Sequence, residues 1–279
     1  MAAPVVDVKT VKKLLEEGLS NLGFEVHTLK VGWYNTVLPA KLHLPYQDDC
    51  LAVVVLSTPT MFEQAFLPFM EERRCQGLSD PIDQCVKHCV TSAVSQFTGQ
   101  QVDVRYDYEL LPSRKPKFLA QTAAHVSGAA FYYQQSDVSD HPWVDKKMFG
   151  VCVHPKFGGW FAIRALLVFQ DIHMDPEEQQ PQPVDCVPNR EARIQLLEDF
   201  NLRWQDWNYR NIITPTQTYS QKQKDYFATP PAKREDLLRS WGLLPESENT
   251  PSPSSGEHAQ GQIDTSRNED GHYFPLDQS

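Results

Sequence analysis

Apolar residues recur at helical spacing near the start of the chain and predict a first helix there. The residues that carry this pattern are Leu14, Leu15, Leu19 and Leu22. Gly23 comes directly after them, where glycine commonly ends a helix. The apolar runs at residues 24–33 and 51–58 have a β-strand composition, so the chain is expected to enter a sheet after this helix.

The middle of the chain predicts two further helices and a strand. An apolar stripe follows Pro59, and Pro68 is expected to bend or end that helix; its residues are Phe62, Phe66, Phe69 and Met70. Asp80 and Pro81 predict the N-cap and first residue of the next helix. Residues 102–111 have the mixed faces of a strand, and residues 118–135 predict a helix of small residues.

The second half of the chain predicts a hairpin and then short helices. Two apolar runs, residues 150–154 and 159–169, flank a turn that contains proline and glycine. Residues 190–245 show short amphipathic patterns rich in Arg, Trp and Tyr. Because helices and strands alternate but include a direct hairpin, we expect an α+β fold with a mainly antiparallel or mixed sheet.

Composition divides the chain near Pro245. Residues 246–279 hold few apolar side chains, so we expect one folded domain, residues 1–245, followed by a disordered acidic tail. The formal charge is −10, and seven acids with one arginine give this tail −6, which leaves −4 for the domain. The acidic balance argues against non-specific binding to nucleic acid or to anionic membranes.

The remaining composition points to a reducing compartment. The longest aliphatic run, residues 51–56, is far shorter than the ~20 residues of a membrane-spanning helix, and the N-terminus lacks a secretory signal. We therefore expect a cytosolic protein whose six cysteines are thiols. Cys85, His88 and Cys89 are spaced like metal ligands, but a structural zinc site needs a second pair, so no metal site is predicted.

The predicted helix at 118–135 is the leading candidate for a ligand site. One helical face would carry Gln121, His125, Gly128, Tyr132 and Gln135. Gly128 and the neighbouring alanines would leave room for a large flat ligand, to which the polar side chains offer hydrogen bonds. Close packing between helices, with His125 a core histidine, explains the same pattern equally well.

Several arginines stand out in this acidic chain and suggest an anionic cofactor or co-substrate, because a guanidinium binds carboxylate or phosphate through paired hydrogen bonds. They are Arg114, Arg164, Arg190, Arg193, Arg203, Arg210 and Arg234. For most of them, a surface ion pair is the simpler interpretation. Arg164 is the exception, since it interrupts an apolar strand where an unpaired charge would be costly.

Several longer segments resemble the methylmalonic aciduria and homocystinuria type C family of cobalamin-processing enzymes. They are Leu22–Val26, Trp33–Asn35, Asp80–Cys85, Leu119–Ala130, Gly158–Arg164, Trp207–Arg210 and Tyr226–Pro231. The resemblance covers about residues 7–240. It implies a flavin-reductase, nitroreductase-like α+β fold, in which a mainly antiparallel sheet is flanked by helices.

This resemblance also implies an activity. Such enzymes bind cobalamin base-off, decyanate cyanocobalamin with electrons from reduced FMN or FAD, and transfer the alkyl group of alkylcobalamins to glutathione. It further implies a homodimer that contacts B12-trafficking and methionine synthase proteins. A cobalamin escort without catalysis is the alternative function. A general flavin reductase would not explain so large a wall of small residues.

Matching positions imply the binding residues, while no catalytic residue is predicted. Those for cobalamin are Asp107, Phe118, Leu119, Ala120, Gln121, His125, Tyr132, Tyr133, Gln134, Cys152 and Ile163. Those for glutathione are Arg164, Arg210 and Arg234. Other B12 enzymes use DxHxxG, but Ala123 occupies the aspartate position here. We therefore expect His125 to line the pocket and not to be a strong cobalt ligand.

Overall fold

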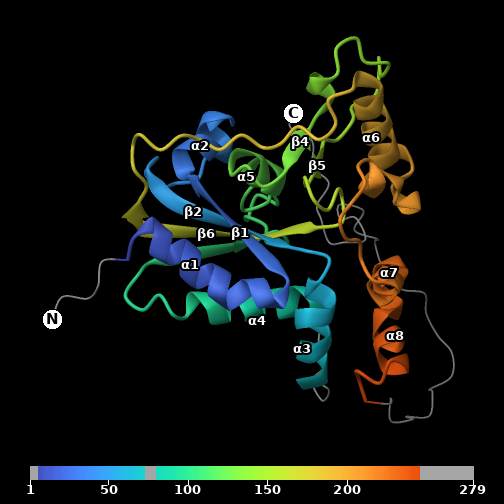
Figure 1. The fold of residues 1–279 in the computed structure, drawn as a ribbon, viewed down its shortest axis with the longest axis horizontal. Helices are drawn as coiled ribbons and strands as arrows, with labels where there is room; N and C mark the ends of the chain where they lie inside the picture. Colours follow the sequence, from blue (N-terminus) through green and yellow to red (C-terminus); the bar gives the residue numbers. More distant parts are fainter. Residues whose placement is uncertain (1–5, 73–79, 246–279) are drawn as a thin grey trace.

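The computed structural model describes residues 6–72 and 80–245, and its centre is a four-stranded antiparallel sheet (Figure 1). The strand order is β1-β2-β6-β3, with β1 (Phe24–Lys30), β2 (Cys50–Ser57), β6 (Ala162–His173) and β3 (Val102–Tyr106). A separate two-stranded sheet pairs β4 (Phe131–Tyr133) with β5 (Val151–Val153). The predicted α+β class with an antiparallel sheet is confirmed, whereas the predicted tail lies outside the described residues.

Helices cover both faces of the central sheet (Figure 1). On one face, Val53, Val55 and Leu167 pack in a core with α1 (Val8–Leu19) and α4 (Pro81–Val94). On the other face, alternate residues of the same strands pack with α2 (Val31–Thr36) and α5 (Ala120–Val126). Every residue of β2 is buried because this central strand is covered on both sides.

The N-terminal elements form largely as predicted. Asp7 caps α1 by accepting a hydrogen bond from the Thr10 backbone, and a 3₁₀ turn, η1 (Ser20–Leu22), leads to Gly23. Gly23 has a φ of 79°, and a Cβ there would lie 2.4 Å from the Met61 backbone nitrogen. The first strand ends at Lys30 and not at residue 33, because α2 begins at once and is held by the Gly32 N–H bond to Asp48 O.

Two predictions rest on proline residues, and only the one for Pro81 is confirmed in full. A π-helical segment, η3 (Phe62–Phe66), runs directly into α3 (Leu67–Glu72), so Pro68 does not end the helix. The wider π turn lies just before the proline, which has no N–H to donate. Pro81 begins α4 as predicted, but Asp80 has a φ of 47° and its side chain makes no capping bond. Asp80 is therefore the N-cap residue as predicted, but its side chain does not cap the helix.

Three predicted elements between residues 102 and 169 are wrong in extent or pairing. The strand predicted for 102–111 ends at Tyr106, where Glu109 accepts the backbone N–H and turns the chain. The helix predicted for 118–135 ends at Val126, because Gly128 reverses the chain with a φ of +76° and β4 follows. The predicted hairpin is limited to one antiparallel bridge between His154 and Gly158, and β5 does not pair with β6. β5 pairs with β4, and the Gly159 N–H bonds to Arg210 O instead of to a β5 residue.

The C-terminal part consists of short helices, as predicted. Leu196 and Leu197 on α6 (Arg190–Leu202) pack with β4 and β5 in a third core. Figure 1 shows α6 beside these two strands. The other helical segments of the C-terminal part are η5 (Trp204–Asp206), η6 (Asn208–Asn211), α7 (Gln221–Ala228), η7 (Pro231–Lys233) and α8 (Arg234–Ser240). Two short segments lie earlier in the chain, η2 (Ala40–Leu42) and η4 (Gln135–Asp137).

Two expectations from composition can be checked on the described residues. No helix within 6–72 or 80–245 has the length and apolar character that a bilayer crossing requires. The cysteines in these ranges carry free thiols, as predicted; they are Cys50, Cys85, Cys89, Cys152 and Cys186.

Candidate functional site

Two neighbouring pockets share Gln121 at the start of α5. The larger has about 750 Å³ of space between α5, β4 and the loop after α2. Its lining comprises Val37, Leu38, Pro39, Leu119, Gln121, Thr122, His125, Val126, Tyr132 and Gln134. The smaller has about 450 Å³ and is lined by Gln121, Gly150, Val151, Cys152, Gly159, Phe161, Ala162, Ile163, Phe200, Tyr209 and Arg210.

The larger pocket presents neutral polar groups at its wall. His125 Nδ1 accepts a hydrogen bond from the Tyr132 backbone N–H at 3.1 Å, so this nitrogen carries no proton. Burial lowers the pKa of His125 below its usual 6.5, which keeps the imidazole neutral at pH 7. Burial also raises the pKa of the Tyr132 phenol, which therefore remains a hydrogen-bond donor.

The smaller pocket combines an apolar wall with one guanidinium. Cys152 is buried, its thiol donates to Gln121 O at 3.6 Å, and burial raises the pKa of this thiol. Arg210 donates to Gly159 O. Its guanidinium carbon lies between 5.0 and 5.6 Å from four ring centroids, those of Trp160, Trp207, Tyr209 and Tyr219. These rings fix a positive charge beside an otherwise apolar space.

Most of the residues predicted to bind cobalamin lie at these pockets. The lining includes Leu119, Gln121, His125, Tyr132, Gln134, Cys152 and Ile163. Gln121, His125 and Tyr132 meet although the predicted long helix is wrong, because the turn at Gly128 folds β4 back beside α5. These three residues therefore line one pocket, although they do not share one helix.

The other predicted cobalamin residues line neither pocket. Asp107 is buried just after β3, Phe118 packs in the core behind α5, and Ala120 is the first residue of α5. Tyr133 points into the third core, where its hydroxyl donates to Asp185 Oδ1 at 2.6 Å and accepts from Val187 N–H at 2.7 Å.

The three predicted glutathione arginines have different surroundings. Arg210 lines the smaller pocket. Arg164 is only 1% exposed and donates from Nε to Ser57 Oγ at 3.0 Å, which confirms its predicted burial in an apolar strand. Arg234 donates to Thr229 O and lies over the Tyr226 ring at 5.0 Å. Arg164 and Arg234 both act on the pKa of Tyr226, which burial raises, so their charges converge there.

The surface interpretation holds for several other arginines. Arg193 pairs with Asp185 at 2.6 Å, and Arg203 pairs with Asp199 at 2.7 Å. Arg190 donates to two backbone carbonyls and pairs with Glu191. These contacts agree with the simpler interpretation given above for these three arginines, a surface ion pair.

Sequence reasoning missed one whole wall of the larger pocket. Val37, Leu38 and Pro39 come from the loop after α2, and the Leu119 N–H bond to the Tyr34 hydroxyl at 2.7 Å ties α2 to the start of α5. No local sequence pattern predicts this contact. Gly150 was also missed as a pocket residue, although its lack of a side chain was a usable signal: a Cβ there would lie 2.5 Å from the Tyr132 ring.

Cys85 and Cys89 do not make a metal site with His88. The Cys85 thiol donates to Cys89, which lowers the pKa of Cys89, and His88 lies against the Phe69 ring at 5.5 Å.

The fold and the two joined pockets define an α+β protein that can bind a broad ligand between its central sheet and its second sheet. The model of the methylmalonic aciduria and homocystinuria type C family matches residues 23–238. The chain belongs to this family.

Relatives from several animals are similar over most of their length. The chain is 57% identical to the Danio rerio "Cyanocobalamin reductase / alkylcobalamin dealkylase" over 89% of this chain and all of that protein. It is 47% identical to the Homo sapiens protein of the same name, over 88% of this chain and 86% of that protein. The crystal structure of the Caenorhabditis elegans B12-trafficking protein CblC matches with a TM-score of 0.78 and 31% identity, covering 87% of this chain and 98% of that chain.

Proposed function

We propose that this chain binds cobalamin base-off and removes its upper axial ligand during intracellular vitamin B12 processing. One reaction is decyanation of cyanocobalamin with electrons from reduced FMN or FAD, and the other is dealkylation of alkylcobalamins by glutathione. The activity in the names of its relatives supports this function. The observation that carries it is the pair of pockets joined at Gln121.

The pocket chemistry suits a corrin ring, which is flat, broad and edged by amides. Gln121, Gln134 and Tyr132 offer neutral donors and acceptors at one pocket, while Ile163 and Phe161 offer apolar contact at the other. Neutral partners are appropriate because the amide edge carries no charge. The apolar contacts keep water away from the face of the ring.

Arg210 is the strongest candidate for binding glutathione, which carries two carboxylates. Arg210 lines the smaller pocket, while Arg164 and Arg234 are the other two arginines that the family resemblance implies. The thiolate sulfur bonds to the alkyl carbon, and the electron pair of the Co–C bond remains on cobalt as cob(I)alamin. Positioning this thiolate in line with the Co–C bond is the main task of the protein.

The remaining parts of the proposal follow from the family resemblance. They are a flavin-reductase, nitroreductase-like fold, a cytosolic location, a homodimer, and contacts with B12-trafficking and methionine synthase proteins. The antiparallel sheet flanked by helices is compatible with such a fold.

Product analysis tests the proposed function. Purified protein, methylcobalamin and glutathione are incubated anaerobically in the dark, and S-methylglutathione is measured by mass spectrometry. We expect one S-methylglutathione for each methylcobalamin consumed, and cyanide release when cyanocobalamin is supplied with reduced FMN. Bound but unchanged methylcobalamin would instead favour the escort, and absence of binding would contradict both functions.

A His125→Ala variant is expected to bind methylcobalamin about fivefold more weakly, because it loses one hydrogen bond worth about 1 kcal/mol in the pocket wall. Dealkylation should continue once the pocket is saturated. The matched control is His173→Ala, whose imidazole pairs with Asp49 at 3.0 Å outside both pockets. Complete loss of dealkylation with intact binding would show that His125 has a direct chemical role.

A further inference from the structure

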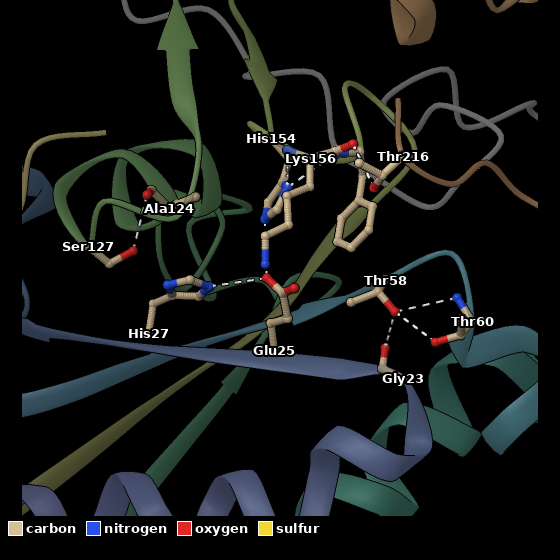
Figure 2. A network of polar contacts seen from close by, with 11 residues as sticks. Gly23, Glu25, His27, Thr58, Thr60, Ala124, Ser127, His154, Lys156 and Thr216 are labelled. Atoms are coloured by element: carbon tan, nitrogen blue, oxygen red, sulfur yellow. Dashed lines mark hydrogen bonds and ion pairs between the residues drawn. The ribbon is translucent and has the colours of Figure 1, made fainter. Parts of the chain in front are cut away.

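A pair formed by the partly buried Glu25 and the buried His154 connects the two sheets (Figure 2), and neither residue lines either pocket. Glu25 lies on the edge strand β1, and His154 follows β5 directly. His154 Nε2 is 3.1 Å from Glu25 Oε2, and the His154 side chain is 3% exposed. His27 reaches the same carboxylate oxygen from β1, at 3.4 Å. Of the two histidines, only His154 brings the second sheet to this carboxylate.

The hydrogen bonds of His154 define its tautomer. Nδ1 accepts the backbone N–H groups of Lys156 at 3.1 Å and Phe157 at 3.3 Å. In the neutral ring Nε2 therefore carries the proton and donates it to Glu25. The bonds from His154 and His27 hold the pKa of Glu25 well below its usual 4.5. A metal ion on these three side chains would have to displace the Nε2 proton, so the cluster is better suited to a hydrogen-bonded pair than to a metal.

His154 also begins the turn that contacts Arg210. Its backbone pairs with Gly158 through two hydrogen bonds, at 2.8 and 2.9 Å. The next residue, Gly159, donates to Arg210 O at 3.0 Å and accepts from the Arg210 guanidinium. A Cβ at Gly158 would lie 2.4 Å from Arg210 O, so the turn lies directly against this residue. Movement of the turn must therefore move Arg210.

The His154 ring makes a second connection to the smaller pocket. It stacks on Phe157 with 4.6 Å between ring centroids and lies 5.4 Å from Phe161. Phe161 lines the same pocket as Arg210. One buried imidazole thus supports two parts of the pocket wall, one through the backbone and one through ring packing.

We propose that Glu25 and His154 are positioning residues that fix the turn at residues 154–159 and thereby hold Arg210 and Phe161 at the smaller pocket. Glu25 anchors the imidazole to the central sheet, and the imidazole holds the turn through Nδ1. The role of the pair in placing a thiol substrate rests on the proposed function. Its role in ordering the turn does not.

Hydrogen exchange of the ligand-free protein tests the ordering of the turn. In Glu25→Ala and His154→Ala we expect the amides of residues 156–161 and 210–216 to exchange at least tenfold faster. Glu25→Gln should remain near wild type, because its amide oxygen can still accept from Nε2. His27→Ala is the matched control: it removes the other imidazole from Glu25 but does not touch the turn, so its exchange should match wild type.

Steady-state kinetics tests the consequence for the pocket. We expect Glu25→Ala and His154→Ala to raise the KM for glutathione about tenfold with kcat within twofold, and Glu25→Gln to restore the wild-type KM. Unchanged exchange in Glu25→Ala, or equal effects in His27→Ala, would overturn the proposal. Faster exchange with an unchanged KM would reduce the pair to a purely structural role and also overturn it. If wild type itself fails to dealkylate methylcobalamin, the proposed function is wrong, while the exchange result still decides the ordering of the turn.

Discussion

We expect a Gly150→Ala variant to bind methylcobalamin about a hundredfold more weakly than wild type, which corresponds to about 3 kcal/mol. The added Cβ would lie 2.5 Å from the Tyr132 ring and 2.7 Å from Tyr133 O. The backbone oxygen cannot move without disturbing the pairing of β4 with β5, so the Tyr132 ring must shift. Both pockets are affected, because Gly150 lines the smaller and Tyr132 the larger. The expected loss lies within the range of about 1–3 kcal/mol for overpacking a well-packed site.

The measurement is a titration of each protein into methylcobalamin, followed by visible absorption. Gly18→Ala is the matched control, because its Cβ would meet Ala93 Cβ of α4 at an ordinary 3.4 Å and Gly18 lines neither pocket. It should bind like wild type. Wild-type affinity in Gly150→Ala would mean that the ligand does not occupy the space beside Tyr132.

The second large effect is expected for an Arg210→Lys variant, whose KM for glutathione should rise about thirtyfold, which corresponds to a loss of about 2 kcal/mol. Lysine keeps the charge but lacks the planar fork that binds a carboxylate through two hydrogen bonds. It also cannot fill the space between Trp160, Trp207 and the other rings around this position. The variant therefore separates the geometry of the guanidinium from its charge.

Initial rates at saturating methylcobalamin and varied glutathione check this prediction. Arg203→Lys is the matched control, since Arg203 pairs with Asp199 on α6 and lines neither pocket. A thermal melt of each variant separates binding from stability, because Arg210 is itself buried. An unchanged KM in Arg210→Lys would remove Arg210 from the thiol site.

Strong local patterns in the sequence predicted the first part of the fold well. The apolar stripe of α1 and the glycine after it depend on neighbours within a few residues, and both are found. The continuous apolar run of β2 marks a strand covered on both faces, which is also found. In both cases the side chains that decide the element lie inside the element itself.

Long-range pairing explains the failures between residues 118 and 169. The small residues after Val126 have no local signal strong enough to distinguish a helix from the observed turn and strand. β4 forms because β5 lies beside it, and the register pairs Tyr132 with Cys152, twenty residues away. The strand pairing predicted for the hairpin failed for a related reason. The Gly159 N–H bonds to Arg210 O, a partner far away in sequence that local turn residues cannot predict.

The candidate site was partly predictable because residue type limits what each position can do. Arg164 in an apolar strand had to be buried with partners, and it is. The sequence places Gln121, His125 and Tyr132 on one polar face, and all three line the larger pocket. The loop at residues 37–39 was not predictable, since long-range contacts between α2 and α5 bring it to the pocket, among them the Leu119 N–H bond to the Tyr34 hydroxyl.

The visible spectrum of methylcobalamin mixed with the purified protein tests the central claim most directly. With protein in excess, we predict a shift to the base-off form on binding, and then loss of the alkylcobalamin spectrum when glutathione is added. A spectrum that stays unchanged through both additions would contradict binding and dealkylation together.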